Sequence, residues 1–232
     1  MLSAGAIIVA AGSGKRMQSE LPKPYLELNG QPILYHTIKN MLGSRFLSEM
    51  VVVVAEDIRG SEILSLCIPK DSPVPITTAV GGEKRQDSVY NGLKALRGNN
   101  PVILVHDGVR PFIKSDTIDR CIQKCSDSDG VVLAIPSHDT LKIVKGGFIS
   151  GNIDRENIWH MQTPQFFKSN ILSEAFTRAK SDKFYGTDEV SLVERISASI
   201  HVAQGDPRNI KITTRDDLML ANSIIKQWEN DE

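Results

Sequence analysis

The sequence predicts an α/β fold built on a mostly parallel sheet. Three short apolar runs, Met50–Ala55, Pro101–Val105 and Gly130–Ile135, have the continuous hydrophobicity of strands that are buried on both faces. Segments with apolar residues at helical spacing lie between and around them. Strands that alternate with helices form right-handed βαβ units, and ligands bind at the carboxyl ends of such strands. We therefore expect the chemistry of this chain in the loops that follow its strands.

The remaining elements continue this alternation. A first strand is expected at Ala6–Val9, where it runs into a glycine-rich loop, and a further strand at Ile76–Val80. Helices are expected where apolar side chains recur at helical spacing, at Pro32–Leu42, Asp87–Leu96 and Thr117–Cys125. The sequence contains no internal repeat and no low-complexity segment.

The composition is that of a globular domain. Of the 232 residues, 41% are hydrophobic and 24% charged, which excludes a disordered or fibrous chain, and we expect one domain over residues 1–232. The formal net charge of −1 does not favour nucleic acid as the main partner. No apolar run approaches the roughly 18 residues of a membrane span, and the first twelve residues lack the basic start of a signal peptide. Three cysteines predict reduced thiols and a cytoplasmic location.

The stretch 137–158 interrupts the βαβ alternation. It indicates a β-hairpin closed by Gly146-Gly147. If these two glycines form a two-residue turn, Thr140 faces Ile153, and Arg155 lies one diagonal step away on the same face. A long hairpin is poorly stable by itself. We therefore expect this arm to lie against the rest of the chain or against a second subunit.

The loop after the first strand, Ala10–Met17, is rich in glycine, which allows backbone amides to approach a phosphate. It lacks the third glycine of the dinucleotide fingerprint and the spacing of a Walker A loop. It carries two cations instead, Lys15 and Arg16, followed by Lys23 between two prolines. Fixed cations beside a glycine loop suit the charge of a triphosphate. The alternative is a glycine turn with solvated basic residues.

A second cluster, Gly81–Ser88, follows a predicted strand and opens a helix. The backbone of the two glycines and the hydroxyl of Ser88 could read the edge of a base, with Arg85 bracing the loops. The alternative is that Asp87 or Ser88 simply caps the helix.

A third cluster, His106–Pro111, comes directly after the strand at 101–105. Its Asp107 and Arg110 stand three apart and could grip a polyhydroxy phosphate, or form a plain salt bridge. We expect His106 to be packed or hydrogen-bonded rather than to act as a base.

The last cluster is Gly205–Thr214. An Asp-Pro turn is expected to feed a short strand that presents Lys211 to the pocket, and Thr214 or Asp216 could cap the final helix. A solvated surface lysine is the alternative for Lys211.

Together these motifs resemble the 2-C-methyl-D-erythritol 4-phosphate cytidylyltransferase family. In order they are AAGSGKRM, PK, GGEKRQDSV, HDGVRPF, a hairpin carrying DT and DR, QTPQ-F at Gln162–Phe166, TDE at Thr187–Glu189, and GDPRNIKITT. The resemblance runs from about Ala4 to Leu220. It implies a Rossmann-like nucleotidyltransferase fold and a homodimer in which the hairpin arm embraces the partner. It also implies transfer of CMP from CTP to methylerythritol phosphate, with release of pyrophosphate and with Mg²⁺ held mainly by the substrate phosphates.

The resemblance also implies roles for particular residues. Arg16 and Lys23 match cations that stabilise the transition state, and Arg155 and Lys211 match residues that position the sugar phosphate. Contacts to the polyol phosphate are implied for Asp107, Arg110 and Thr140. Binding of CTP is implied for Ala10, Ala11, Gly12, Gly14, Gly82, Glu83, Arg85 and Ser88. The sequence offers no clustered carboxylates for a metal held by the protein.

Three positions depart from the family pattern: Gly108-Val109 in place of Ala-Ala, Pro24 in place of a frequent Gln, and Lys84 in place of an acidic residue. Val109 keeps a ribitol-5-phosphate cytidylyltransferase open as an alternative. Alternatives from other classes are an NAD(P)-dependent oxidoreductase built on the first glycine loop and a non-catalytic nucleotide-sensing module. Met17 and the proline-bracketed lysine argue against the oxidoreductase.

Overall fold

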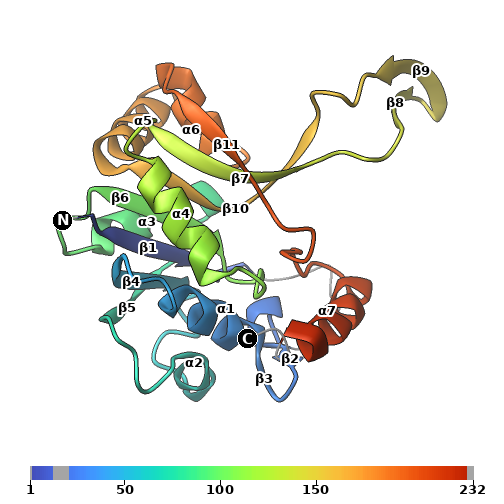
Figure 1. The fold of residues 1–232 in the computed structure, drawn as a ribbon. Coiled ribbons are helices and arrows are strands. Elements are labelled where there is room, and N and C mark those ends of the chain that lie inside the picture. The colour runs from blue at the N-terminus through green and yellow to red at the C-terminus, as the bar shows by residue number, and fades with distance from the viewer. Residues whose placement is uncertain (1, 13–20, 229–232) are drawn as a thin grey trace.

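A seven-stranded sheet with helices on both faces forms the body of the protein, and a two-stranded arm projects from it (Figure 1). The computed structural model describes residues 2–12 and 21–228. The strands of the sheet are β1 Ala4–Val9, β4 Leu47–Val54, β5 Ile76–Val80, β6 Val102–Asp107, β7 Gly130–Pro136, β10 Trp159–Lys168 and β11 Ile200–Gln204. They lie in the order β11, β7, β10, β6, β1, β4, β5.

Neighbouring strands of this sheet run parallel, except that β10 is antiparallel to both β6 and β7. The predicted α/β class with a mostly parallel sheet is confirmed, and the strands expected at residues 6–9, 50–55, 76–80, 101–105 and 130–135 all occur within a few residues of their expected ends. Strand β10 was not among the expected strands. It contains the QTPQ-F motif, and its polar residues and proline hide the apolar pattern of a buried strand.

The helices of the described chain lie mainly in two layers. They are α1 Ile33–Leu42, α2 Glu62–Cys67, α3 Arg85–Ala95, α4 Ser115–Lys124, α5 Ser169–Ser181, α6 Val190–Val193 and α7 Arg215–Trp228. Short 3-10 turns occur at Lys23–Tyr25 and Glu194–Ile196, and a small β2–β3 pair joins Glu27–Leu28 to Gln31–Pro32. The first layer, α1, α2 and α4, covers one face of the sheet, and α3, α5 and α6 cover the other. None of the helices within the described ranges is long and apolar enough to cross a membrane.

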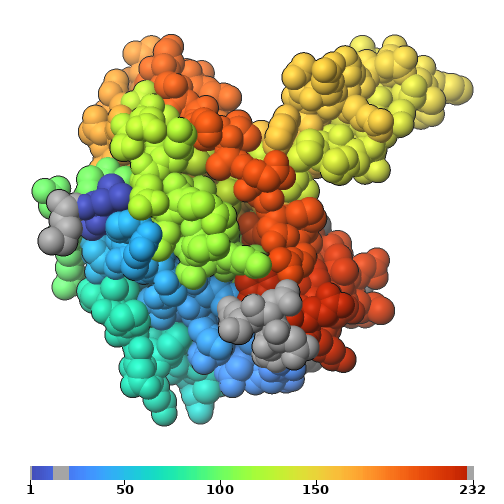
Figure 2. Space-filling model, in the orientation of Figure 1, coloured from blue at the N-terminus to red at the C-terminus, as the bar shows by residue number. Residues whose placement is uncertain are grey.

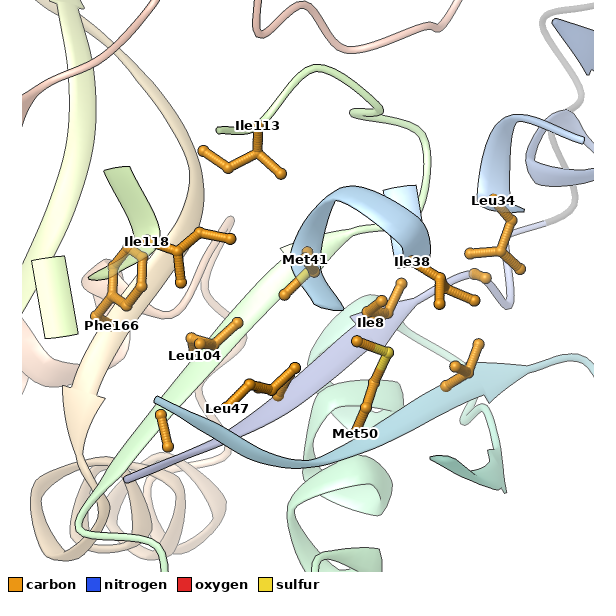
Figure 3. Packing of buried hydrophobic residues seen from close by; sticks show 14 of the residues in the cluster. Ile8, Leu34, Ile38, Met41, Leu47, Met50, Leu104, Ile113, Ile118 and Phe166 are labelled. Carbon is orange, nitrogen blue, oxygen red and sulfur yellow. The ribbon is translucent and has the colours of Figure 1, made fainter. Parts of the chain in front are cut away.

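The two layers share the central strands because successive residues of a strand point to opposite faces. Ile8 of β1 packs on the first face with Ile38 of α1 and Met50 of β4, as Figure 3 shows. Its neighbour Ile7 packs on the second face, where Val89 of α3 also lies. Continuous apolar runs thus supply both cores at once, which is why the sequence predicted strands buried on both faces.

Helix α3 begins two residues earlier than predicted. Lys84 is its N-cap, and its backbone N–H donates to the carboxylate of Asp87 at 3.1 Å. The alternative that Asp87 or Ser88 caps this helix is met in part: neither is the N-cap residue, but the Asp87 carboxylate accepts from the N-cap backbone as one half of a capping box. Thr214 does cap α7, where its Oγ1 accepts from the backbone N–H of Asp217 at 3.2 Å.

The segment before α7 carries Lys211. The expected short strand is absent at residues 205–214, all of which the structure describes; the segment is an irregular stretch. The backbone N–H of Ile212 donates to the carbonyl of Val109 at 3.0 Å, and both side chains pack under Trp228 of α7 in a third apolar cluster. This contact fixes the loop after β6 beside Lys211 without a strand.

The arm consists of β8 Leu141–Lys145 and β9 Phe148–Ile153, which pair with each other as a separate sheet. It projects from the body of the molecule (Figure 2). The predicted register holds at the turn but is wrong at the base, because a bulge at Ser150 shifts the pairing and places Leu141 opposite Ile153. Thr140 and Arg155 lie beyond the last pair, so the prediction that Thr140 faces Ile153 is not met.

Candidate active site

A cleft of about 470 Å³ lies at the carboxyl edge of the sheet, where the loops after β1, β5 and β6 converge. This is the edge at which parallel sheets bind ligands. The cleft is lined by Val9, Ala10, Ala11, Gly12, Lys23, Pro24, Gly82, Glu83, Lys84, Arg85, Ser88, Asp107, Val109 and Lys211. Most of the residues that the sequence singled out therefore meet in one place.

The first loop reaches the cleft directly from β1. Ala10 is buried, and its backbone N–H donates to the carbonyl of Val53 at 2.8 Å, while Gly12 is exposed and has open space around it. Lys23 begins a short turn whose next two residues, Pro24 and Tyr25, are buried. Buried neighbours hold the backbone of this lysine in place. Gly14 and Arg16 lie outside the described residues.

The Gly81-Gly82 loop depends on close packing. A side chain at Gly81 would come within 2.4 Å of the Ala11 Cβ, and one at Gly82 within 2.3 Å of the Asp87 Cβ. The backbone N–H of Gly82 donates to the Ser88 Oγ at 3.1 Å, and that hydroxyl donates to the carbonyl of Lys84 at 3.1 Å. The N–H of Gly82 and the hydroxyl proton of Ser88 are thus both used within the loop, and the Ser88 oxygen keeps one lone pair with which to meet a ligand.

The carboxylate of Asp107 is the centre of a cluster of cations. Its oxygens lie 2.8 Å from the Lys211 Nζ, 3.4 Å from the Arg85 Nε and 3.6 Å from the Arg110 Nε. Burial alone would raise the pKa of Asp107, but Arg85 and Lys211 outweigh it and hold that pKa well below its ordinary value. Asp107 is therefore ionised at neutral pH and gathers three cationic side chains around it, of which Arg85 and Lys211 line the cleft.

Arg85 links this cluster to an acid that the sequence analysis did not assign a role. Its Nη1 donates to Glu189 at 2.7 and 3.0 Å, and Glu189 is only 1% exposed. The TDE motif that contains Glu189 was visible in the sequence, but nothing in its spacing showed a partner about a hundred residues away. The bracing role suggested for Arg85 agrees with these two contacts.

His106 is buried in a hydrogen-bonded network behind Asp107. Its Nε2 lies 3.0 Å from the carbonyl of Arg110, and its Nδ1 lies 2.9 Å from the Thr163 Oγ1, which also accepts from the backbone N–H of Asp107 at 3.1 Å. A carbonyl can only accept, so Nε2 carries the proton and Thr163 donates to Nδ1. Burial lowers the pKa of His106 to about 4. His106 is thus neutral and hydrogen-bonded, as expected from the sequence, and holds the loop of Asp107 and Arg110.

Arg110 itself is turned partly away from the cleft. Its Nη1 donates to the carbonyl of Asn209 at 2.6 Å, which ties the loop after β6 to the segment that carries Lys211. Thr140 and Arg155 lie at the base of the arm, where both are exposed, and the Nη1 of Arg155 donates to the carbonyl of His138 at 2.5 Å. Neither lines the cleft of its own chain. These two are the predicted site residues that the described chain does not bring to the others.

No group of three His, Cys, Asp or Glu side chains is placed to hold a metal ion within residues 2–12 and 21–228. The buried acids near the cleft, Asp107 and Glu189, are both engaged with cationic side chains. The chemistry of this site is that of an anion receptor built from backbone amides and fixed cations.

Comparison with known proteins gives a consistent match over nearly the whole chain. Residues 4–227 match the family model described as 2-C-methyl-D-erythritol 4-phosphate cytidylyltransferase. The protein of that name from Syntrophus aciditrophicus is 41% identical over 229 residues, which is 97% of this chain and 96% of that protein.

Two crystal structures show the same fold. That of 4-diphosphocytidyl-2C-methyl-D-erythritol synthase from Anaerococcus prevotii aligns with a TM-score of 0.85 at 29% identity, over 97% of this chain and 96% of that one. That of 2-C-methyl-D-erythritol 4-phosphate cytidylyltransferase from Francisella tularensis aligns with a TM-score of 0.80 at 32% identity, over 95% of this chain and 98% of that one.

Proposed function

Since the chain belongs to the 2-C-methyl-D-erythritol 4-phosphate cytidylyltransferase family, we propose that its cleft is where CMP passes from CTP to methylerythritol phosphate. Membership of this family confirms the predicted activity, a nucleotidyl transfer of the non-mevalonate isoprenoid pathway. Family membership does not favour the ribitol-phosphate cytidylyltransferase, and it argues against the NAD(P)-dependent oxidoreductase that the first glycine loop had left as an alternative. The observation that carries the location is the meeting of the glycine loops with Lys23, Arg85 and Lys211 at one edge of the sheet.

The reaction needs charge stabilisation and positioning more than acid–base chemistry. The phosphate of the sugar is already an anion at pH 7, so one of its oxygens attacks the α-phosphorus of CTP without a strong base. The new P–O bond forms as the bond to the bridging oxygen breaks, and pyrophosphate leaves with that electron pair. Lys23 lines the cleft, which supports the proposal that it stabilises the charge that develops on the triphosphate. The same role is proposed for Arg16.

The two substrates would occupy opposite ends of the cleft. The amides of Ala10, Ala11 and Gly12, with Gly14, would cradle the triphosphate, and Gly82, Glu83 and Ser88 would read cytosine. Asp107 would accept from polyol hydroxyls while Lys211, already 2.8 Å from it, meets the sugar phosphate. Mg²⁺ would enter as part of the substrate MgCTP, because this ion keeps several waters and is commonly bound through substrate phosphates.

The exposed surface of the arm supports a homodimer. Phe148, Ile149 and Val144 are 79%, 70% and 59% exposed, on a hairpin that pairs only with itself among the described strands. A two-stranded hairpin with apolar side chains in water is marginal. We infer that this arm lies on a second copy of the chain and brings Thr140 and Arg155 to that copy's cleft.

Small molecules rather than nucleic acid are the proposed substrates, in keeping with the formal net charge of −1. The cysteines Cys67, Cys121 and Cys125 are buried and unbridged. Free thiols are typical of a reducing compartment, so we propose the cytoplasm as the location.

A pyrophosphate-release assay tests the function. We expect release with CTP and methylerythritol phosphate, and poor turnover when ribitol 5-phosphate replaces the alcohol. ATP and GTP should hardly be used, because a site that hydrogen-bonds one base leaves buried polar groups unpaired with another. A comparable kcat/KM for ATP would refute the Gly82–Ser88 loop as the cytosine reader.

A further inference from the structure

The Thr187–Glu189 segment has no role in the reaction described above, yet it ends in a buried acid. Glu189 immediately precedes α6 and is 1% exposed, and its two carboxylate oxygens both face the guanidinium of Arg85. Buried charges are retained only where they are paired, and a carboxylate that takes two hydrogen bonds from one arginine is held in a fixed orientation.

One side chain of the sheet fixes the backbone around Glu189. The Nε2 of Gln165 in β10 donates to the Asp188 carboxylate at 2.8 Å, and the Oε1 of Gln165 accepts from the backbone N–H of Val190 at 3.3 Å. Gln165 is itself buried and therefore rigid. The residues on both sides of Glu189 are thus tied to the same strand, so the position of its carboxylate is set by the sheet.

Arg85 stands between two acids. Its Nη1 is 2.7 Å from Glu189, whereas its Nε is 3.4 Å from Asp107, so the guanidinium lies closer to Glu189. Burial raises the pKa of Glu189, as do Asp107 and Asp188, while Arg85 opposes this increase. In turn Glu189 and Asp107 raise the pKa of Arg85 against its own burial. Asp107 therefore shares Arg85 and keeps its shorter contact, 2.8 Å, with Lys211.

We propose that Glu189 is a positioning residue of the transfer reaction, which draws Arg85 away from Asp107 so that Asp107 stays available to Lys211 and to the alcohol phosphate. The proposal rests on the site assigned under the proposed function. Without the charge of Glu189, Arg85 has Asp107 as its remaining acid partner among the described residues, and it competes there with Lys211 and with the hydroxyls of the substrate. The loop assigned to cytosine is held without Arg85, because the Gly82 and Lys84 amides donate to Ser88 and Asp87. Arg85, which the resemblance assigned to CTP, is instead engaged with Asp107 and Glu189.

The test compares Glu189→Gln with wild type by steady-state kinetics for each substrate. We expect the KM for methylerythritol phosphate to rise about tenfold, the scale of one charged hydrogen bond, while the KM for CTP stays within about twofold. The exposed Glu194→Gln, five residues further on, is the matched control and should behave as wild type. Equal increases in both KM values together with a lower Tm would show a merely structural role and overturn the proposal, as would unchanged kinetics.

Glu189→Asp covers the case in which the amide variant does not fold. The aspartate keeps the buried negative charge, but its side chain is one methylene shorter, so the carboxylate lies farther from Arg85. We expect the KM for methylerythritol phosphate to rise about threefold in this variant, with the KM for CTP again nearly unchanged. If the ratio of these two KM values were the same in the variant as in wild type, the proposal would also be overturned. The proposed function fails separately, if wild type releases no pyrophosphate with CTP and methylerythritol phosphate. Calorimetric binding of CTP, unchanged in either variant, is the readout that does not depend on turnover.

Discussion

In the cleft, the buried carboxylate of Asp107 is already paired with cations of its own chain, whereas the arm leaves its largest apolar side chains in solvent. Asp107 holds Arg85, Arg110 and Lys211 within 3.6 Å, while Phe148 at the tip of the arm is 79% exposed. Burying unpaired charges is costly, so the cleft must be assembled on folding. Apolar side chains that are exposed on the free chain are unfavourable in water, and association with a second copy would bury them. The cleft is therefore preorganised by one chain, and the proposed dimer is what would bury the apolar side chains of the arm.

The largest effect should appear at Lys23. We expect Lys23→Ala to reduce kcat by about 10²–10³ while the protein stays folded, because a fixed cation at a developing charge acts mainly on the transition state. Single-turnover pyrophosphate release measures it. Lys70→Ala, an exposed lysine in a turn after α2, is the matched control. A folded Lys23→Ala enzyme with nearly normal kcat would remove Lys23 from the catalytic machinery.

A change in the arm should act on association and leave the fold of the body intact. We expect Phe148→Asp to weaken the dimer by about 30-fold or more, since a large aromatic side chain at an interface centre commonly contributes 2 kcal/mol or more. Analytical ultracentrifugation over a concentration series measures the Kd. The control is Leu66→Asp, which places the same charge at a 59% exposed residue of α2. If Phe148→Asp leaves the dimer Kd unchanged, the arm is not the interface.

The smallest effect expected is on stability at acid pH. The pKa of His106 is about 4 in the folded protein and 6.5 in the unfolded chain, so the unfolded state binds more protons as pH falls below 6.5. From pH 7 to pH 5 this one group should lower the free energy of unfolding by about 1–2 kcal/mol. Urea titrations of wild type and His106→Gln should differ in pH dependence by that amount.

His201→Gln, which removes an exposed imidazole from β11, should follow wild type in the same titrations. If His106→Gln declined with pH as steeply as wild type, His106 would not be a buried neutral residue. Because Thr163 and Arg110 flank His106, this measurement also reports on the loop that positions Asp107.

The sequence predicted the parallel core well because each central strand is a continuous apolar run that serves two layers. Ile7 and Ile8 illustrate this directly, since adjacent residues pack on opposite faces. Strand β10 escaped prediction because its polar residues Gln162, Thr163 and Gln165 are buried with hydrogen-bond partners that are distant in the sequence. Hydrophobic periodicity does not detect such a strand.

In the site, too, only the features that have a local sequence pattern could be predicted. The glycine loops, Asp107 and Lys211 were identifiable because each follows a turn or strand signal, although Lys211 lies on an irregular segment instead of a strand. The pairing of Arg85 with Glu189 is a contact between residues 104 apart and leaves no local pattern. The arm register differed from the prediction because a bulge at Ser150 adds one residue that a count from the turn does not reveal.

Mixing two inactive variants tests the crossed-arm dimer most directly. Lys23→Ala removes a group of the cleft and Arg155→Ala a group of the arm, so a heterodimer with crossed arms has one site with both lesions and one with neither. Random exchange makes about half of the dimers mixed, so activity should recover to about a quarter of wild type. If Arg155 serves its own chain's cleft, every site keeps one lesion, and no recovery despite confirmed subunit exchange would contradict the crossed-arm dimer.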